Sequence, residues 1–185
     1  MTLAPVVVLD ACVLTNFSLC DTLLRLAELP PLYEPRWSEE ILEETIRTLE
    51  SDLGWPPSLT AFLRGELRAH FSEAWVAGYE ALIPAMKNDE KDRHVLAAAV
   101  HCGASVILTF NLRHLRPEHL AGWGVTAVHP QAFLIELFQQ GPTVVLAKLE
   151  EQAADRGRSL SALLKILGRT VPGFTALLGA HRPPP

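Results

Sequence analysis

The chain has 185 residues, of which 49% are hydrophobic, enough for one domain with a sizeable core and a small appendage. Its formal net charge of −5 argues against a protein whose whole surface binds nucleic acid, because phosphate contacts are made by Lys and Arg. The longest apolar runs are far shorter than the roughly 20 residues that cross a bilayer, and the N-terminus lacks the basic and apolar regions of a secretion signal. We therefore expect a cytoplasmic protein with no membrane association.

The first half of the chain alternates between strand and helix patterns. Residues 5–10 (PVVVLD) contain a continuous β-branched run, as expected for a strand that is buried on both faces. Ser38 is a good N-cap for a helix over residues 38–53, in which apolar side chains recur at helical spacing. The remaining patterns predict a helix over 14–29, a short strand over 32–35, helices over 58–70 and 72–79, and a connecting segment over 82–87.

The second half repeats this alternation. A helix is predicted over residues 90–102, with Gly103 placed to end it in the left-handed conformation, and a second buried strand is predicted over 105–109. Gly141 and Pro142 mark a boundary. The other expected elements are helices over 117–120, 131–139, 144–153, 160–167 and 174–178 and a strand over 125–128. Alternating strands and helices favour a parallel sheet covered on both faces, so we predict an α/β fold with α/β/α layers.

Polar side chains gather where a parallel sheet collects its ligands, at the carboxyl ends of strands and at nearby helix starts. Asp10 ends the first strand, and Asn111 follows the second buried strand by two residues. Asp89 and Asp92 open the helix before that strand and lie three residues apart, on one face. Taken singly, each could be a helix cap or a turn residue. Hard divalent cations prefer such oxygen ligands, so their convergence predicts a metal site for phosphodiester chemistry.

A further carboxylate is expected from the helix over residues 38–53, where four glutamates compete. These are Glu39, Glu40, Glu43 and Glu44. Glu40 and Glu44 share a face at i, i+4. Because Glu44 lies at the edge of the apolar stripe, where a side chain can reach inward, we prefer it.

Four motifs, in this order, resemble the PIN-domain family, the metal-dependent ribonuclease fold that includes the VapC-type toxins of bacterial toxin–antitoxin systems. They are VVLDACVL, WSEEILEETIRTL, NDEKDRHVLAAAV and VILTFNLRHL, and with HPQAFL they span about residues 5–139. The last motifs resemble a branch of the family with a short helical C-terminal extension. The resemblance implies a three-layer α/β/α PIN-like nuclease domain over residues 1–140 and a basic helical extension over 141–185.

The resemblance also implies which residues act. The implied catalytic acids are Asp10, Glu44 and Asp92, with Asp89 beside them. The implied ligands of Mg²⁺ or Mn²⁺ are Asp10, Glu44, Asp92 and Asn111. The implied reaction is hydrolysis of RNA by a metal-activated water. The implied partners are RNA, a cognate antitoxin and a second copy of the chain.

Four side chains near this site are candidate RNA ligands, since basic groups bind phosphate oxygens. Arg113, His114 and Arg116 follow the second buried strand, and Arg93 lies on the preceding helix. Residues 141–185 carry six Lys or Arg against three Asp or Glu, whereas the rest of the chain carries ten basic and eighteen acidic residues. We therefore expect the extension to contact RNA or a partner.

Two positions depart from the family's pattern. The family commonly has Asp where this chain has Asn111, which leaves open a catalytically weak or inactive PIN-fold module that binds RNA or protein. It often has Asn or Ser where this chain has Cys12, and Asn16 could replace that side chain only if the loop bends back.

A haloacid-dehalogenase phosphatase would need a second Asp at position 12, so that class is disfavoured. Three cysteines without CxxC spacing indicate neither a disulfide framework nor a zinc site.

Overall fold

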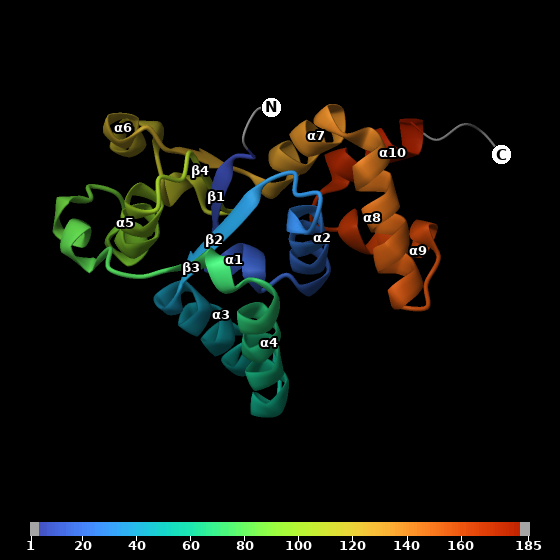
Figure 1. The fold of residues 1–185 in the computed structure, drawn as a ribbon, viewed down its shortest axis with the longest axis horizontal. Helices are drawn as coiled ribbons and strands as arrows, with labels where there is room; N and C mark the ends of the chain where they lie inside the picture. The colour runs from blue at the N-terminus through green and yellow to red at the C-terminus, as the bar shows by residue number, and fades with distance from the viewer. Residues whose placement is uncertain (1–3, 182–185) are drawn as a thin grey trace.

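The computed structural model describes residues 4–181, and its centre is a five-stranded sheet (Figure 1). The strands lie in the order β3-β2-β1-β4-β5, and every neighbouring pair is parallel. Their bounds are β1 Val6–Leu9, β2 Glu34–Ser38, β3 Trp75–Val76, β4 Val106–Leu108 and β5 Thr126–Val128. The prediction of a small parallel sheet is therefore confirmed.

Strand β1 lies in the middle of the sheet because its side chains can be buried on both faces. From Val7 on, they are fully buried. Val7 pairs with Pro35 of β2 on one side and with Val106 of β4 on the other. The carboxyl ends of parallel strands meet at the same edge of a sheet, so Asp10 comes to lie beside the end of β4.

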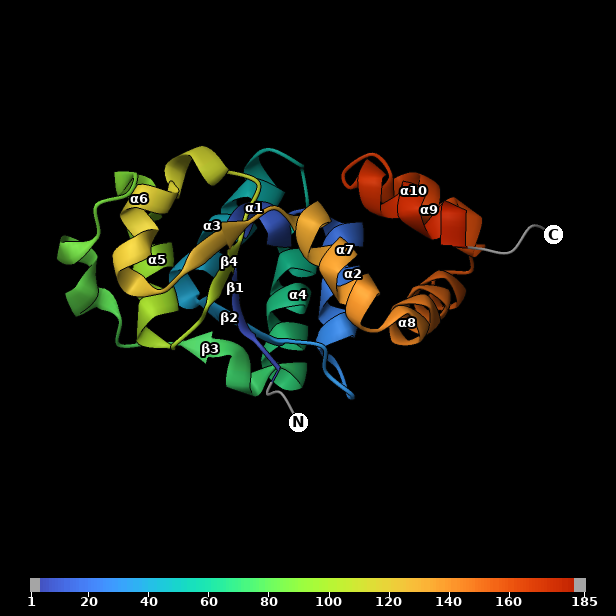
Figure 2. The same ribbon diagram turned by 90° about the horizontal axis from the view of Figure 1, so that it is seen from above.

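Helices cover both faces of the sheet and give the expected α/β/α layers. In Figure 2, α5 lies on one side of the central strands, and α2 and α7 lie on the other. The helices before the extension are α1 Ala11–Leu14, α2 Phe17–Ala27, α3 Glu39–Ser51, α4 Pro57–His70, α5 Arg93–His101, α6 Pro117–Leu120 and α7 Pro130–Gln140. The short 3-10 helices are η1 Ser72–Ala74, η2 Glu80–Ala85, η3 Glu90–Asp92, η4 Leu112–His114 and η5 Ala121–Trp123. Within the described residues, no helix has the length and apolar character needed to cross a membrane.

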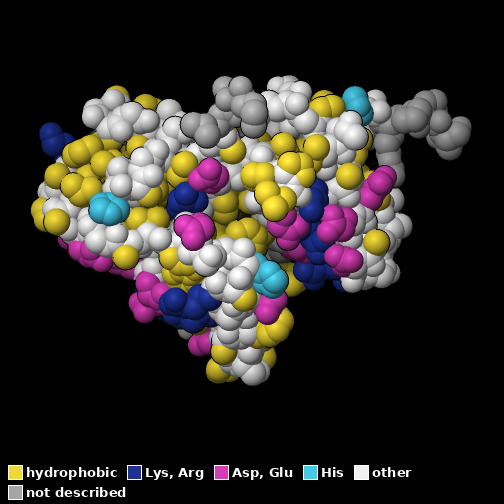
Figure 3. Space-filling view, in the orientation of Figure 1, with side chains coloured by type: hydrophobic (Ala, Val, Ile, Leu, Met, Phe, Trp, Pro, Cys, Tyr) yellow, Lys and Arg dark blue, Asp and Glu magenta, His cyan; other side chains and the backbone are white. Residues whose placement is uncertain are grey.

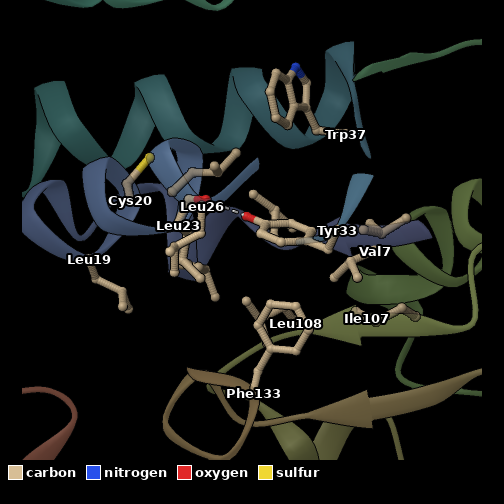
Figure 4. Packing of buried hydrophobic residues seen from close by; sticks show 14 of the residues in the cluster. Val7, Leu19, Cys20, Leu23, Leu26, Tyr33, Trp37, Ile107, Leu108 and Phe133 are labelled. Atoms are coloured by element: carbon tan, nitrogen blue, oxygen red, sulfur yellow. Dashed lines mark hydrogen bonds between the residues drawn. The ribbon is translucent and has the colours of Figure 1, made fainter. Parts of the chain in front are cut away.

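One part of the core lies where α2, the sheet and α7 meet (Figure 4). Tyr33 is fully buried there and packs edge-on against Phe133, with the ring centroids 5.1 Å apart. Its hydroxyl donates to the backbone carbonyl of Leu23 at 2.8 Å, so the polar group is satisfied within apolar surroundings. These contacts join the chain before β2 to α2 and α7.

One predicted helix is wrong. Residues 72–79 contain η1 followed by β3, in which Trp75 and Val76 pair with Trp37 and Ser38 of β2. The free edge of β2 offers backbone hydrogen-bonding partners, and aromatic and β-branched residues suit a strand. A helix of two turns is marginal without packing, so pairing with the sheet prevails over the helical pattern.

Two other predicted helices differ from the structure at their starts. The helix predicted over 14–29 begins only at Phe17, as α2 with Asn16 as its N-cap, and a separate short helix, α1, fills the chain between β1 and Asn16. The helix predicted over 90–102 starts as η3, and α5 begins only at Arg93. Gly103, at φ +69°, ends α5 in the predicted left-handed conformation. The helices predicted over 117–120 and 160–167 are present with those bounds, the other predicted elements are present with shifted ends, and the connecting segment after β3 contains η2.

The C-terminal extension packs on the rest of the protein through α2 and α7. Its helices are α8 Pro142–Asp155, α9 Leu160–Leu167 and α10 Pro172–His181. Gln152 of α8 is fully buried; its amide accepts from the hydroxyl of Thr22 at 2.7 Å and donates to the carbonyl of Ser18 at 3.0 Å. The hydrophobic core continues into these helices. The division of the chain at residue 140 stays a prediction.

Part of the extension's positive charge is paired with α2. The Nζ atom of Lys148 lies 3.0 Å from Oε2 of Glu28, and Nη2 of Arg156 lies 2.7 Å from Oδ2 of Asp21. Lysine, arginine and acidic side chains intermingle in Figure 3 where α2 meets α8. Two of the basic residues behind the expected contact with RNA or a partner are therefore engaged within the protein, and Arg182 lies outside the described residues. That contact stays a prediction.

Candidate metal centre

Asp10 is held firmly at the carboxyl end of β1. Its backbone amide donates to the carbonyl of Leu108 at 3.1 Å, which extends the pairing of β1 with β4. Its side chain accepts hydrogen bonds from the hydroxyl of Thr109 at 2.6 Å and from the thiol of Cys12 at 3.1 Å, and the residue is 4% exposed. Hydrogen bonds to a charged acceptor are strong and directional, so they orient this carboxylate.

Cys12 helps to order the site even though it departs from the family's pattern. Besides donating to Asp10, its sulfur accepts from the backbone amide of Phe110 at 3.3 Å. Burial and the charge of Asp10 raise the pKa of the thiol to about 12, so it stays protonated at neutral pH. Asn16 does not take over this role, since it caps α2 and donates to Thr170 at 3.0 Å.

Of the four glutamates on α3, Glu44 lines the same cavity as Asp10. The other three have different surroundings. Glu39 pairs with two arginines of α4, Glu40 accepts from a tyrosine hydroxyl, and Glu43 is exposed. The structure thus brings the preferred glutamate to the predicted site.

A buried histidine faces Glu44 across the boundary between α3 and α5. His94 is 4% exposed, and its Nε2 lies 3.4 Å from Glu44 Oε2 and its Nδ1 lies 3.9 Å from Glu40 Oε1. These distances fit ion pairs better than well-formed hydrogen bonds. Burial lowers the pKa of the imidazole, but the hydrogen-bonding group and charge of Glu44, with the charges of Glu40 and Asp10, raise it above its ordinary value. A protonated His94 offsets part of the negative charge of this cluster.

Asp92 lies at the start of α5 and pairs with a histidine that follows β4. His114 Nδ1 is 2.8 Å from Asp92 Oδ2. Burial raises the pKa of the Asp92 carboxyl group; the hydrogen bond from His114 opposes that rise, and the charge of Asp10 adds to it. Because repulsion between crowded carboxylates is relieved by a cation, this environment suits a metal ligand.

Asp89 lies beside this pair, outside the lining of the cavity that holds the other acids. Its exposed carboxylate accepts from the backbone amide of Lys91 at 3.2 Å, which is a capping contact. Ligand atoms of Asp89, Asp92 and His114 nevertheless lie within 4.8 Å of one another. Asp92 therefore belongs to two neighbouring groups of possible ligands, and His114 is a metal-ligating candidate that the sequence analysis assigned to RNA instead.

Asn111 approaches the site from the loop after β4. Its backbone amide donates to the hydroxyl of Thr109 at 2.9 Å, and that hydroxyl donates in turn to Asp10. The side-chain amide of Asn111 supplies an oxygen ligand without a negative charge. The strand ends of β1 and β4 are thus linked directly beside the cavity.

All four predicted metal ligands line one cavity of about 350 Å³. It lies between the chain after β1, α3 and the loop after β4. Its lining residues are Asp10, Ala11, Cys12, Thr15, Glu44, Arg47, Thr48, Asp92 and Asn111. Three carboxylates and an amide oxygen are hard donors, so this set fits Mg²⁺ or Mn²⁺ better than a soft metal. The sequence analysis missed Thr15, Arg47 and Thr48, whose residue types carry no metal signal.

The predicted RNA ligands have partners within the protein. Arg93 donates from Nε to a backbone carbonyl at 3.3 Å. Arg113 donates to His114 Nε2 at 3.1 Å, and Arg116 donates to the carbonyl of Arg113 at 3.3 Å. The guanidinium groups of Arg113 and Arg116 are exposed, so these contacts leave donors available. Their contact with RNA stays a prediction.

The sequence is similar to that of a curated bacterial protein. It is 40% identical over 106 residues to the Mycobacterium tuberculosis protein named "Putative ribonuclease VapC50". The alignment covers 56% of this chain and 63% of that relative, so the chain spans less than two thirds of the relative's length. No family model matches the chain, and no solved structure matches it with significance.

Proposed function

We propose that this chain is a member of the VapC-type PIN-domain family and a metal-dependent endoribonuclease, which its sequence similarity and parallel α/β fold support. The observation that carries the proposal is the cavity at the carboxyl edge of the sheet, where three carboxylates and an amide oxygen meet. The relative's name describes a ribonuclease, which agrees with this donor set. RNA is therefore the proposed substrate, and hydrolysis of a phosphodiester bond is the proposed reaction.

Asp10, Glu44, Asp92 and Asn111 would hold the ion. When bound, Mg²⁺ or Mn²⁺ supplies Lewis-acid activation of a phosphate oxygen and of a water molecule. Asp10 is already oriented by two hydrogen bonds, so it requires little rearrangement to act as a ligand. Glu44 reaches the same cavity from α3, opposite the strand ends.

The contact between His114 and Asp92 orients a ligand at the edge of the site. The imidazole Nδ1 lies 2.8 Å from the Asp92 carboxylate, and Arg113 donates to Nε2 on the other side of the ring. His114 therefore fixes the direction in which Asp92 presents its oxygens. Asp89, within reach of both side chains, would support the same end of the site.

We further propose that the protein is the toxin of a toxin–antitoxin pair, as its family suggests. An antitoxin that inserts an Arg or Lys into the acidic cavity would compete with the cation for the same carboxylates. A cytoplasmic location and a homodimer complete this proposal.

Cleavage of total RNA in Mg²⁺, Mn²⁺ or EDTA tests the nuclease. Asp10→Asn and Asp92→Asn each remove one charge at almost constant size. We expect cleavage only with a divalent ion, and a loss of about 100-fold or more in each variant, because metal coordination contributes several kcal/mol to transition-state stabilisation. Glu43→Gln, an exposed position on the helix that carries Glu44, is the matched control and should retain activity. Equal cleavage in EDTA, or by all variants, would reject the catalytic assignment.

A PIN-fold module with weak or no catalysis is the second candidate, because Asn111 lines the cavity where the family commonly has an acid. The substitution Asn111→Asp separates the two. A wild type that binds RNA without cleaving it, and that gains cleavage on this substitution, would favour the second candidate. Metal-dependent cleavage by the wild type favours the nuclease.

A further inference from the structure

Arg47 is the basic residue in the lining of the acidic cavity. It lies on α3, three residues after Glu44, so the two side chains share a helix face. Asp10, Glu44 and Asp92 contribute three negative charges to the same lining, whereas Arg47 contributes one positive charge. Its side chain is therefore placed to contact a ligand that enters the cavity along α3.

Within residues 4–181, the guanidinium of Arg47 forms neither an ion pair nor a hydrogen bond, and the residue is exposed. An acidic neighbour is nevertheless present, since Glu44 lies on the same face of α3. The carboxylate of Glu44 instead faces His94 at 3.4 Å. Six other basic residues of the protein are paired with acids, namely Arg25, Arg36, Arg64, Arg68, Lys148 and Arg156. Arg47 differs from the remaining ones in that it lines the acidic cavity.

An arginine at this place can be a solvated side chain, a counter-ion for the acids, or a ligand for an anion. The absence of a contact with Glu44 argues against the counter-ion. An anionic substrate must approach a cavity with three carboxylates, and a fixed positive charge at its lining lowers that barrier. The guanidinium has a planar fork of donors that matches phosphate oxygens, and none of these donors is engaged by the residues that the structure describes.

We propose that Arg47 binds a backbone phosphate of the RNA next to the bond that is cut. This inference rests on the proposed ribonuclease function and adds a contact on α3 to the substrate site. Thr48, which lines the same cavity, offers a neutral hydroxyl donor beside it, whereas the hydroxyl of Thr15 donates to the carbonyl of Cys12 at 3.0 Å. A contact to phosphate positions RNA without reading its sequence.

The test measures binding of a labelled, mixed-sequence single-stranded RNA by fluorescence anisotropy in Mg²⁺. An Asp92→Asn background prevents cleavage during the measurement. Arg47→Ala and Arg47→Lys are compared with Arg68→Ala, which removes the same charge at an exposed arginine of α4, outside both the cavity lining and the extension. Each substitution is also made in the wild type to obtain kcat and KM, and Mn²⁺ affinity is measured by calorimetry.

We expect Arg47→Ala to weaken RNA binding about tenfold at low salt, as for a lost hydrogen bond to a charged group. The slope of log affinity against log salt should fall by about one. Arg47→Lys should recover part of the affinity, and KM should rise more than kcat falls. Arg68→Ala should bind like the reference protein, and Mn²⁺ affinity should not weaken in Arg47→Ala.

Unchanged RNA affinity in Arg47→Ala would overturn the contact, and so would a loss of equal size in Arg68→Ala. Tighter Mn²⁺ binding with unchanged RNA binding would identify Arg47 as a counter-ion and would likewise overturn it. Both results leave cleavage by the wild type intact, so they are distinct from failure of the proposed function. A wild type that neither binds nor cleaves RNA would reject the proposed function and this contact together.

Discussion

Thr109 is uncharged and fully buried, yet it connects two sides of the candidate metal centre. Its hydroxyl donates to Asp10 and accepts from the backbone amide of Asn111. A buried carboxylate without donors is costly because its charge is no longer solvated. Thr109 therefore stabilises the charge of Asp10 and joins the ends of β1 and β4 with one side chain.

Replacing Thr109 with Val removes the hydroxyl and keeps the branched shape. We expect the free energy of unfolding at neutral pH to fall by about 1.5–3 kcal/mol, since a hydrogen bond to a charged group is lost. Mn²⁺ affinity should fall about tenfold, because a ligand loses the partner that orients it. Denaturant unfolding and calorimetric titration measure the two effects. Thr109→Ser should behave like the wild type, and equal Mn²⁺ affinity in Thr109→Val would contradict the orienting role.

At the scale of elements, helix α7 begins with an uncommon cap. His129 Nδ1 accepts from the backbone amide of Gln131 at 3.1 Å, a role that Ser, Asn or Asp usually fills. Its ring packs edge-on against Phe110, with the centroids 5.1 Å apart. Burial lowers the pKa of His129 below its ordinary value of 6.5. The folded protein therefore favours the neutral imidazole, whose Nδ1 is free to accept.

This cap makes the stability of the protein depend on pH. Because the folded pKa of His129 is lowered, its contribution is fully present above the unfolded pKa and is lost as the pH falls through the folded pKa. His129→Asn keeps a capping oxygen that does not titrate. We expect the wild type to lose more thermal stability than this variant between about pH 7 and pH 5. Parallel pH profiles for the two proteins would refute the prediction.

At the scale of the whole molecule, the extension supports α2 and the chain next to the cavity. Val145, Leu149 and Gln152 of α8 are fully buried. Thr170 accepts from Asn16, which directly follows the cavity-lining Thr15. The extension therefore contributes to the core and to the position of the loop between α1 and α2.

Deleting residues 141–185 should lower stability strongly, because each fully buried large apolar side chain contributes about 1.5–3 kcal/mol. RNA cleavage should fall with it. A truncated chain that unfolds at the wild-type temperature would show instead that the two parts fold independently.

Lys165→Glu combined with Arg169→Glu changes only exposed residues and tests the expected contact with RNA or a partner. Unchanged RNA affinity and oligomeric state in that double variant would reject the contact.

Much of the architecture was predictable because it depends on local pattern. The β-branched run of residues 5–10 has no polar face, so it suits only a strand buried on both sides. Ser38 caps α3 with a hydrogen bond from the amide of Ile41 at 3.2 Å, as its position indicated. Asp10 and Asn111 could be expected to meet, because both follow parallel strands and such strands end at one edge of the sheet.

By itself, therefore, the sequence determined the alternation of strands and helices, the parallel sheet and the acids that approach its carboxyl edge. Only the tertiary structure decided that residues 75–76 form an edge strand, that His94 and His114 face acidic side chains, and that Arg47 lines the cavity without a partner among residues 4–181. The physical reason is the distance along the chain over which each kind of interaction acts. Periodicity, capping and strand composition act between neighbours in the chain, whereas these pairings join residues that are brought together only when the sheet and its helices pack.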